Sequence, residues 1–390
     1  MATITLDWLH IVALLGAVQG LILAGVLAVK RRNRTANRVL AVDILSFTIY
    51  LATSVYHAAG LEQVFPHFFG AAYLMPLLYG PLTYLYAVTA SDRSRRLTRR
   101  DALHFVPFVL AIVLTLPIYL MSGADKTAFY HALQRGERPL LLQVLDPLKL
   151  LSGITYVGVT LLFLRRHRAR IEDSYSSLEH VNLQWLVRLA AAGAGIWVLA
   201  VVFQVTDFGR GDDIITLALA LLVYGIGYMA LRQPEIFRFD TGESPVPAAE
   251  SMVQTGQSES RYERSGLSDW QGAALKKALL ASMDRDRPWQ NSDLTLADLA
   301  QRLSTTPHKL SEVLNSQLRQ SFYDFVNGYR VRQVQRRIES EDAKNLTILS
   351  LALDAGFASK STFNDVFKKH TGKTPSDYRR SSVAANRLAG

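Results

Sequence analysis

The helical pattern of the carboxyl-terminal third is clearest in residues 346–379, LTILSLALDAGFASKSTFNDVFKKHTGKTPSDYR. Its apolar residues recur at helical spacing on both sides of the turn GFAS, at Ile348, Leu351, Ala352, Ala355, Phe363 and Phe367. Gly356 stands where the first helix should end, because glycine adopts the left-handed conformation of a helix terminus at little cost. The pattern predicts a helix-turn-helix with helices over 348–355 and 360–370. Its second helix then presents polar residues outward: Lys360, Ser361, Asn364, Asp365 and Lys368.

A pair with the same layout lies upstream, in residues 295–318. Thr295 with Asp298 gives a capping-box pattern, and Thr306 precedes a proline that suits the first position of a helix. These signals predict helices over 296–303 and 307–318, joined by the turn STTP. The two helices would bury one apolar face made of Leu296, Leu299, Ala300, Leu303, Leu310, Val313, Leu314 and Leu318. Outward on the second helix stand His308, Lys309, Ser311, Glu312 and Asn315.

A long helix is predicted between the two pairs, over 322–339, with Ser321 and Asp324 at its start. It carries the basic residues Arg330, Arg332, Arg336 and Arg337, of which we expect Arg330 to contact DNA. This helix would hold the two pairs at a fixed distance, so that their second helices enter successive segments of the major groove. Short polar side chains suit base edges, and Lys and Arg suit phosphates, so we predict binding to double-stranded DNA. One charged helix face usually only meets solvent, whereas two such pairs in one basic domain favour this interpretation.

The same stretch resembles the signature of the AraC/XylS family of transcription regulators. The matching positions are Ala352, Gly356, Phe357, Ser359, Ser361, Phe363, Phe367, Lys368, Lys369, Gly372, Thr374, Pro375, Tyr378 and Arg379. Upstream, SFYDFVNGYRVRQVQRRI resembles the family's linker helix, and LTLADLAQRLSTTPHKLSEVLN resembles its first helix-turn-helix. The sequence departs from the family pattern at Ser304, where glycine is common, at Val334, where alanine is usual, and at Asp365, where a basic residue is frequent.

The resemblance implies sequence-specific binding to promoter DNA that activates or represses transcription. An activator of this kind would also contact RNA polymerase. The family usually carries a companion domain that senses a ligand or dimerises. Because a single copy of the DNA-binding domain recognises only a short site, we expect a homodimer on direct repeats. Asp365 would repel phosphate, which would weaken the contribution of the second pair. No cofactor is implied.

An acidic bridge separates this basic domain from the rest of the chain. Residues 240–260, DTGESPVPAAESMVQTGQSES, are rich in Ser, Gly, Pro and Glu and show no apolar periodicity, which is typical of a linker. Residues 261–390 hold 21 Lys and Arg against 14 Asp and Glu. We therefore divide the chain into domains at 1–239 and 261–390, with residues 240–260 as a flexible linker.

The first domain is apolar enough for a membrane bundle. The whole chain is 49% hydrophobic with a mean hydropathy of +0.12, high for a soluble enzyme of 390 residues. About 20 apolar residues span a bilayer, and the sequence supplies seven such stretches. They run over 8–29, 39–58, 68–89, 103–121, 144–164, 186–205 and 214–231. The expected fold class is therefore all-α: seven transmembrane helices followed by a cytoplasmic helical domain with two helix-turn-helix motifs.

The basic residues between these stretches predict the orientation of the chain. The loops after the first, third and fifth stretches and the exit after the seventh hold sixteen Lys and Arg. The other side holds only Lys126, Arg135, Arg138 and Arg210. By the positive-inside rule the amino terminus lies outside, and the carboxyl-terminal domain lies in the cytoplasm of a bacterial cell, below its inner membrane. Charges follow rather than precede the first stretch, so we expect a retained span and not a cleaved signal peptide.

Ionisable residues inside spans suggest where an unknown small-molecule or membrane signal could bind. The candidates are Asp43, His57, Asp146 and Lys149, with His67, Tyr73, Tyr79 and Tyr84 near the outer side. Structural alternatives stay open, because Asp146 and Lys149 have the spacing of a pair on one helix face and tyrosines commonly lie at membrane interfaces. A GxxxG pattern at Gly16 and Gly20 would allow close helix contact or dimerisation.

Several other classes of protein lack support in the sequence. There is no cysteine, so disulfides, thiolate metal sites and a cysteine nucleophile are excluded. The last stretch has no lysine for a retinal Schiff base, and neither HExxH nor a phosphate-binding GxxxxGK[ST] occurs. We therefore expect no enzyme activity. A transporter or channel with a cytoplasmic regulatory module stays open as the alternative, based on Asp43, Asp146 and Lys149.

Overall fold

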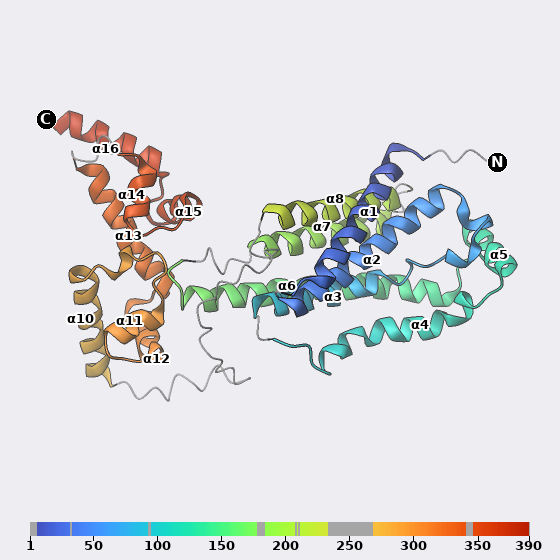
Figure 1. The fold of residues 1–390 in the computed structure, drawn as a ribbon, viewed down its shortest axis with the longest axis horizontal. Helices are drawn as coiled ribbons and strands as arrows, with labels where there is room; N and C mark the ends of the chain where they lie inside the picture. Colours follow the sequence, from blue (N-terminus) through green and yellow to red (C-terminus); the bar gives the residue numbers. More distant parts are fainter. Residues whose placement is uncertain are drawn as a thin grey trace. The chain divides into compact units, whose positions relative to one another are not determined.

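The computed structural model describes residues 6–31, 33–92, 95–177, 184–206, 209, 211–232, 268–340 and 346–389. The predicted linker over 240–260 lies outside these residues. Within them the regular structure is helical apart from one isolated β-bridge, between Tyr175 and Thr295 (Figure 1). The chain forms two compact units, which are described separately. The amino-terminal unit is residues 1–165 and 183–246, and the carboxyl-terminal unit is residues 166–182 and 247–390.

Long apolar helices make up most of the amino-terminal unit. They are α1 (Trp8–Val29), α2 (Arg34–Ala58), α3 (Pro76–Ser91), α4 (Val106–Tyr119), α5 (Gly123–Gln134), α6 (Leu140–Glu172), α7 (Gln184–Thr206) and α8 (Gly211–Arg232). In the described residues, six helical segments are long and apolar enough to cross a membrane, and they match the predicted stretches other than 68–89. These helices confirm the all-α class.

The structure over residues 68–89 differs from the single long helix that the sequence predicts there. Over 68–89 the chain forms turns as far as residue 75, and α3 occupies only the second half. Pro76 begins this helix, because its fixed φ and missing N–H suit a first helical turn. Gly70 adopts a φ of +79° within the preceding turns, a conformation that stops a helix. Apolar composition alone had suggested one continuous helix.

Close packing of α1 depends on its two spaced glycines. A Cβ on Gly16 would lie 3.4 Å from the Cβ of Ala220 in α8, and one on Gly20 would overlap Thr48 Oγ1 in α2. Both glycines are buried. The GxxxG pattern therefore brings helices of the same chain together.

The carboxyl-terminal unit contains seven α-helices within its described residues, and the five between residues 296 and 371 lie where the sequence predicts helices. They are α10 (Asp269–Arg285), α11 (Leu296–Arg302), α12 (Pro307–Glu312), α13 (Phe322–Glu339), α14 (Ile348–Asp354), α15 (Lys360–Thr371) and α16 (Pro375–Ala389). A π-helical turn at Val313–Leu318 extends α12. Ser268 and Thr295 form capping boxes, and Ser321 caps α13. The local signals in the sequence thus set the helix starts.

Two apolar cores lie on either side of α13. The first joins α10 to α12 with the start of α13, around Leu299, Leu310 and Val326. The second joins α14 to α16 with the end of α13, around Val334 and Phe367. Figure 1 shows the two helix-turn-helix motifs at opposite ends of α13. The predicted role of this helix as a spacer between them is confirmed.

Candidate nucleic-acid interface

The first recognition helix consists of α12 and its π-helical extension. The Thr306 hydroxyl accepts the N–H of Lys309 at 3.4 Å and so caps the helix. Leu310 and Leu314 are completely buried, which fixes the face that turns outward. His308 and Lys309 on that face are exposed.

The other three predicted residues of this helix are less accessible. Ser311, Glu312 and Asn315 are half-buried, and Asn315 Nδ2 donates a hydrogen bond to Ser311 Oγ at 3.3 Å. The first recognition helix therefore presents its exposed residues His308 and Lys309 near its amino-terminal end. A helix entering the major groove makes its base contacts there.

The second recognition helix is α15. Ser359 caps it by accepting the N–H of Thr362 at 3.3 Å. Phe363 and Phe367 anchor its inner face in the second core. The five predicted outward residues are all exposed: Lys360, Ser361, Asn364, Asp365 and Lys368. Lys360 and Lys368 are thus available for phosphates on this helix. Lys369 also lies on it but pairs with Asp324 at 2.7 Å.

Arg330 does not lie with the other predicted DNA-binding residues. Its side chain is 1% exposed and donates to the carbonyl oxygens of Trp289 and Asn291 at 2.8 and 2.7 Å. Burial lowers the pKa of its guanidinium to about 10, which still leaves it charged at neutral pH. Five carbonyl and side-chain oxygens accept its hydrogen bonds and satisfy this buried charge. Sequence periodicity did not separate it from the exposed Arg332 and Arg336.

Two of those oxygens belong to Ser176, in the segment that follows α6. Arg330 Nη1 donates to Ser176 O at 3.0 Å, and Nη2 donates to Ser176 Oγ at 3.2 Å. Asn327 Nδ2 also donates to Ser176 O, at 3.1 Å. The sequence offered no signal for Ser176, because its partners are more than 100 residues away.

Gly356 makes a close backbone contact with the loop at residues 289–290. Its φ is +87°, and a Cβ there would lie 2.5 Å from Trp289 O and 2.7 Å from Gln290 O. The turn of the second helix-turn-helix therefore packs directly on the loop whose carbonyls receive Arg330. Only glycine fits this position.

In the amino-terminal unit, the four candidate sensing residues all line one cavity. Its volume is about 1040 Å³, and its walls include Asp43, His57, Asp146 and Lys149. The polar walls also include Tyr50, Tyr73 and Tyr79. The structure thus brings together two pairs of residues from two predicted spans, 39–58 and 144–164.

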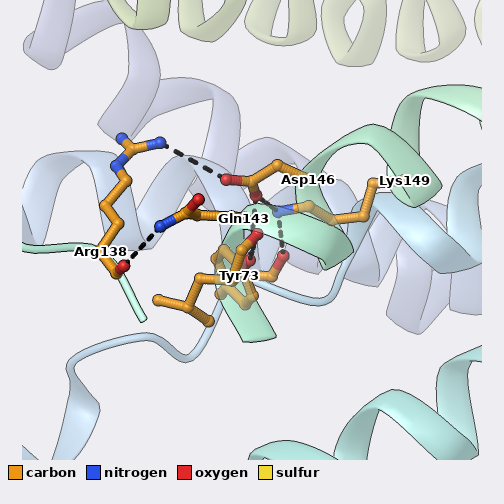
Figure 2. A network of polar contacts seen from close by, with 6 residues as sticks. Tyr73, Arg138, Gln143, Asp146 and Lys149 are labelled. Carbon is orange, nitrogen blue, oxygen red and sulfur yellow. Dashed lines mark hydrogen bonds and ion pairs between the residues drawn. The ribbon is translucent and has the colours of Figure 1, made fainter. Parts of the chain in front are cut away.

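A polar cluster lies at one part of this cavity (Figure 2). Lys149 Nζ pairs with Asp146 Oδ1 at 2.7 Å, and Arg138 Nη1 reaches Asp146 Oδ2 at 3.5 Å. The Tyr73 hydroxyl donates to Asp146 Oδ1 at 3.0 Å, and Lys149 Nζ lies 3.5 Å from the centre of the Tyr73 ring. Gln143 Nε2 donates to Arg138 O at 2.7 Å. The spacing of Asp146 and Lys149 had predicted their pairing, whereas Arg138 and Gln143 had not been assigned to this cluster.

Asp43 lies apart from that cluster. Its side chain is 2% exposed, and Oδ2 accepts from Thr83 Oγ1 at 3.0 Å. Asp43 Oδ1, Tyr79 OH and Thr160 Oγ1 are buried and have no hydrogen-bond partner among the described residues. All of these residues line the cavity. His57 pairs instead with Glu62, through Nδ1 and Oε1 at 2.5 Å.

Comparison with known proteins agrees with the helical arrangement of the carboxyl-terminal unit. Residues 299–381 match the family described as a helix-turn-helix domain, of the AraC/XylS type. An uncharacterized HTH-type transcriptional regulator of Staphylococcus aureus (strain COL) is 30% identical over 89 residues, which are 23% of this chain and 12% of that protein. The probable transcription factor PqrA of Proteus vulgaris is 38% identical over 54 residues, which are 14% of this chain and 44% of that protein.

The family match lies within the carboxyl-terminal unit. The chain spans less than half the length of either of these relatives. No solved structure matches the chain. The chain thus carries an AraC/XylS-type helix-turn-helix domain over residues 299–381.

Proposed function

Because residues 299–381 form an AraC/XylS-type helix-turn-helix domain, we propose that the chain is a membrane-embedded, sequence-specific regulator of transcription. The observation that carries this proposal is the pair of recognition helices at opposite ends of α13, each with exposed polar and basic residues. Both relatives are described as transcription regulators or factors, which supports the same function. Double-stranded promoter DNA is the partner, and a homodimer binds direct repeats.

The proposed DNA contacts come from the outward faces of both recognition helices, on which Ser311, Glu312 and Asn315 are half-buried and the other residues are exposed. They are His308, Lys309, Ser311, Glu312 and Asn315 on the first, and Lys360, Ser361, Asn364 and Lys368 on the second. Lysines bind phosphates, and the short polar side chains contact base edges. Arg330 is left out of this set because it is buried. It acts instead as a positioning residue inside the domain.

The amino-terminal unit serves as the membrane anchor and sensor in this proposal. Six long apolar helices support its insertion, and α3 supplies the further crossing. The distribution of Lys and Arg between the helices supports an orientation with the amino terminus outside and the carboxyl-terminal unit in the cytoplasm of a bacterial cell. A single-cysteine variant tests this topology cleanly, since the chain has no cysteine. Ser381→Cys should resist a membrane-impermeant maleimide in intact cells, whereas Ser122→Cys should react.

We assign the signal to the cavity of the amino-terminal unit. The basic side chains that line it each pair with a carboxylate other than Asp43: His10 with Asp7, His57 with Glu62, and Arg138 and Lys149 with Asp146. Thr83 donates to Asp43 Oδ2, but Asp43 Oδ1 has neither a cation nor a hydrogen-bond donor among the described residues, and a carboxylate oxygen inside an apolar bundle needs one. Asp43 therefore suits the ammonium group of a small organic amine, and aromatic walls suit its apolar part.

A matched pair of probes tests this assignment. The full-length protein in nanodiscs is heated with 2-phenylethylamine or with 2-phenylethanol, which lacks the positive charge. At 100 times its Kd the amine stabilises the unit by about 2.7 kcal/mol. The shift should be absent with the alcohol and in Asp43→Asn. Equal shifts with both probes would exclude an ionic role for Asp43.

DNA binding is tested with the same full-length protein. A randomised pool of duplexes should yield a preferred sequence, and affinity for it should fall steeply with salt. Lys309→Ala should lower the slope of log affinity against log salt by about one. Lys277→Ala is the matched control, because Lys277 is an exposed lysine on α10 and belongs to neither recognition helix. Selection of no sequence would contradict the proposed function, and uptake of a solute that depends on Asp43 would favour a transporter.

A further inference from the structure

A short segment of the chain after α6 is bound in the carboxyl-terminal unit like an added strand. Ser176 N–H donates to Leu294 O at 3.2 Å, and Leu296 N–H donates to Ser174 O at 3.0 Å. These two bonds flank Tyr175 and Thr295, which form an antiparallel bridge. The Ser176 hydroxyl also donates to Leu294 O at 2.6 Å. We call Ser174–Ser176 the docking segment.

The receiving site for this segment is buried and polar. Ser176 is 0% exposed, and its carbonyl accepts from Asn327 and Arg330 at 3.1 and 3.0 Å. Asn327 is also 0% exposed and Arg330 is 1% exposed. Removing the segment would leave buried donors of both side chains without two of their acceptors, which is costly for a charged group. The site is therefore built around the segment.

The docking segment contacts both the start of α11 and the middle of α13. Leu296 is the first residue of α11, whose amide has no acceptor within the helix. Asn327 and Arg330 lie on α13. The docking segment thus fastens the start of the first helix-turn-helix to the helix that spaces the two recognition helices. A change in this contact changes how the first recognition helix is held relative to the second.

The docking segment lies in the connection between two long apolar helices, α6 and α7. It follows α6 directly, since that helix ends at Glu172, and α7 begins at Gln184. Both helices contain apolar stretches long enough to cross a membrane. The carboxyl-terminal unit is therefore connected to the apolar helices through the docking segment as well as through residues 233–268.

We propose that the docking segment is a coupling element, through which movement of α6 or α7 changes the DNA affinity of the carboxyl-terminal unit. Docked, it holds α11 on α13 in the geometry that binds DNA with both recognition helices. Withdrawn, it leaves Arg330 with three of its five acceptors and frees the start of α11. The effect on DNA rests on the proposed function, whereas the contact itself is tested without DNA.

The contact is tested by a disulfide in the full-length protein in membrane vesicles. Tyr175 and Thr295 are a non-hydrogen-bonded pair, in which Cα atoms of opposed residues lie about 4.5 Å apart and suit a disulfide. The double variant Tyr175→Cys, Thr295→Cys should close completely when diamide takes up the two thiol hydrogens. The double variant Tyr175→Cys, Ser304→Cys should stay open. Failure of the first pair to close would overturn the proposal.

Coupling to DNA is tested by breaking the contact. Ser176→Pro removes the N–H that bonds to Leu294 O, and Ser176→Ala removes only the bonds of the hydroxyl. Ser177→Ala is the matched control, because the buried Ser177 hydroxyl has no hydrogen-bond partner among the described residues. Amide hydrogen exchange at Leu296 should become at least tenfold faster in Ser176→Pro and stay unchanged in Ser177→Ala. The amide of Val334, inside α13, reports whether the domain stays folded.

The same variants are then compared for affinity to the duplex selected from the randomised pool. Ser176→Pro should weaken binding at least fivefold, Ser176→Ala should weaken it less, and Ser177→Ala should match the unchanged chain. Faster exchange at Leu296 with unchanged DNA affinity would overturn the coupling role. If the unchanged chain selects no duplex, the proposed function fails while disulfide closure still decides the contact.

Discussion

The substitution Gly356→Ala should destabilise the carboxyl-terminal unit more than any other single methyl addition to its turns. The backbone at Gly356 has a φ of +87°, and the new Cβ would lie 2.5 Å from Trp289 O and 2.7 Å from Gln290 O. These are backbone atoms, so the loop at 288–290 must move. Trp289 O accepts the 2.8 Å hydrogen bond from Arg330 Nε, which would be lost or strained by that movement.

The magnitude follows from two contributions. A left-handed backbone costs a residue with a Cβ about 1–2 kcal/mol, and loss of a hydrogen bond from a charged group costs about 1.5–3 kcal/mol. We therefore expect Gly356→Ala to lower the free energy of unfolding by about 3–5 kcal/mol, a large part of the total for a typical domain. Gly372→Ala is the control, because Gly372 has a φ of +72° but nothing lies within 4 Å of the added Cβ. Its cost should be the backbone part alone, about 1–2 kcal/mol.

The assay is hydrogen exchange at the Val334 amide of the full-length protein in nanodiscs. This amide lies inside α13, beside the second core, and so follows opening of the carboxyl-terminal unit. The free energy of opening of the carboxyl-terminal unit should fall in both variants, and it should fall further in Gly356→Ala than in Gly372→Ala. Equal effects of the two substitutions would refute the claim that the turn of the second helix-turn-helix packs on the loop that binds Arg330.

Three further results are expected. Ser304 has a φ of +51°, so Ser304→Gly should relieve strain and raise the free energy of unfolding by about 0.5–1 kcal/mol, measured by the same exchange experiment. Asp365 is an exposed acid on the second recognition helix, so Asp365→Asn should strengthen DNA binding about two- to fivefold at low salt, and the gain should vanish in high salt. Burial raises the pKa of Tyr323 to about 12, and the unfolded state ionises near the ordinary value of 10. Stability of the unit should therefore fall as pH rises from 10 to 12, and exchange measurements on Tyr323→Phe should show a smaller fall.

Local signals in the sequence predicted the carboxyl-terminal helices well. Hydroxyl caps such as Thr295 and Ser321 satisfy amides within a few residues, and Gly356 ends α14 through its own backbone freedom. Such effects depend on neighbouring residues, so they can be recognised from spacing. The outward faces of α12 and α15 followed from the same periodicity.

Long-range packing could not be predicted in this way. Arg330 shares the helical spacing of exposed arginines, yet the carbonyls that bury it come from residues 39 to 154 positions away. Ser176 lies in a polar loop whose sequence has no feature that marks it as a docking site. Its partners on α13 are recognised only in the folded structure. Likewise, the break before α3 and the pairing of Gly16 with α8 depend on tertiary contacts.

The most direct test of the account is recovery of DNA from the membrane fraction of cells that produce the full-length chain. After crosslinking and sedimentation of the membranes, the chain should retain a small set of discrete chromosomal sites that share one sequence. Those sites should be lost in a variant carrying Lys309→Ala and Lys368→Ala, and kept in one carrying Lys277→Ala. Membranes that contain the chain but recover no more discrete sites than membranes without it would contradict a regulator that binds DNA while embedded in the bilayer.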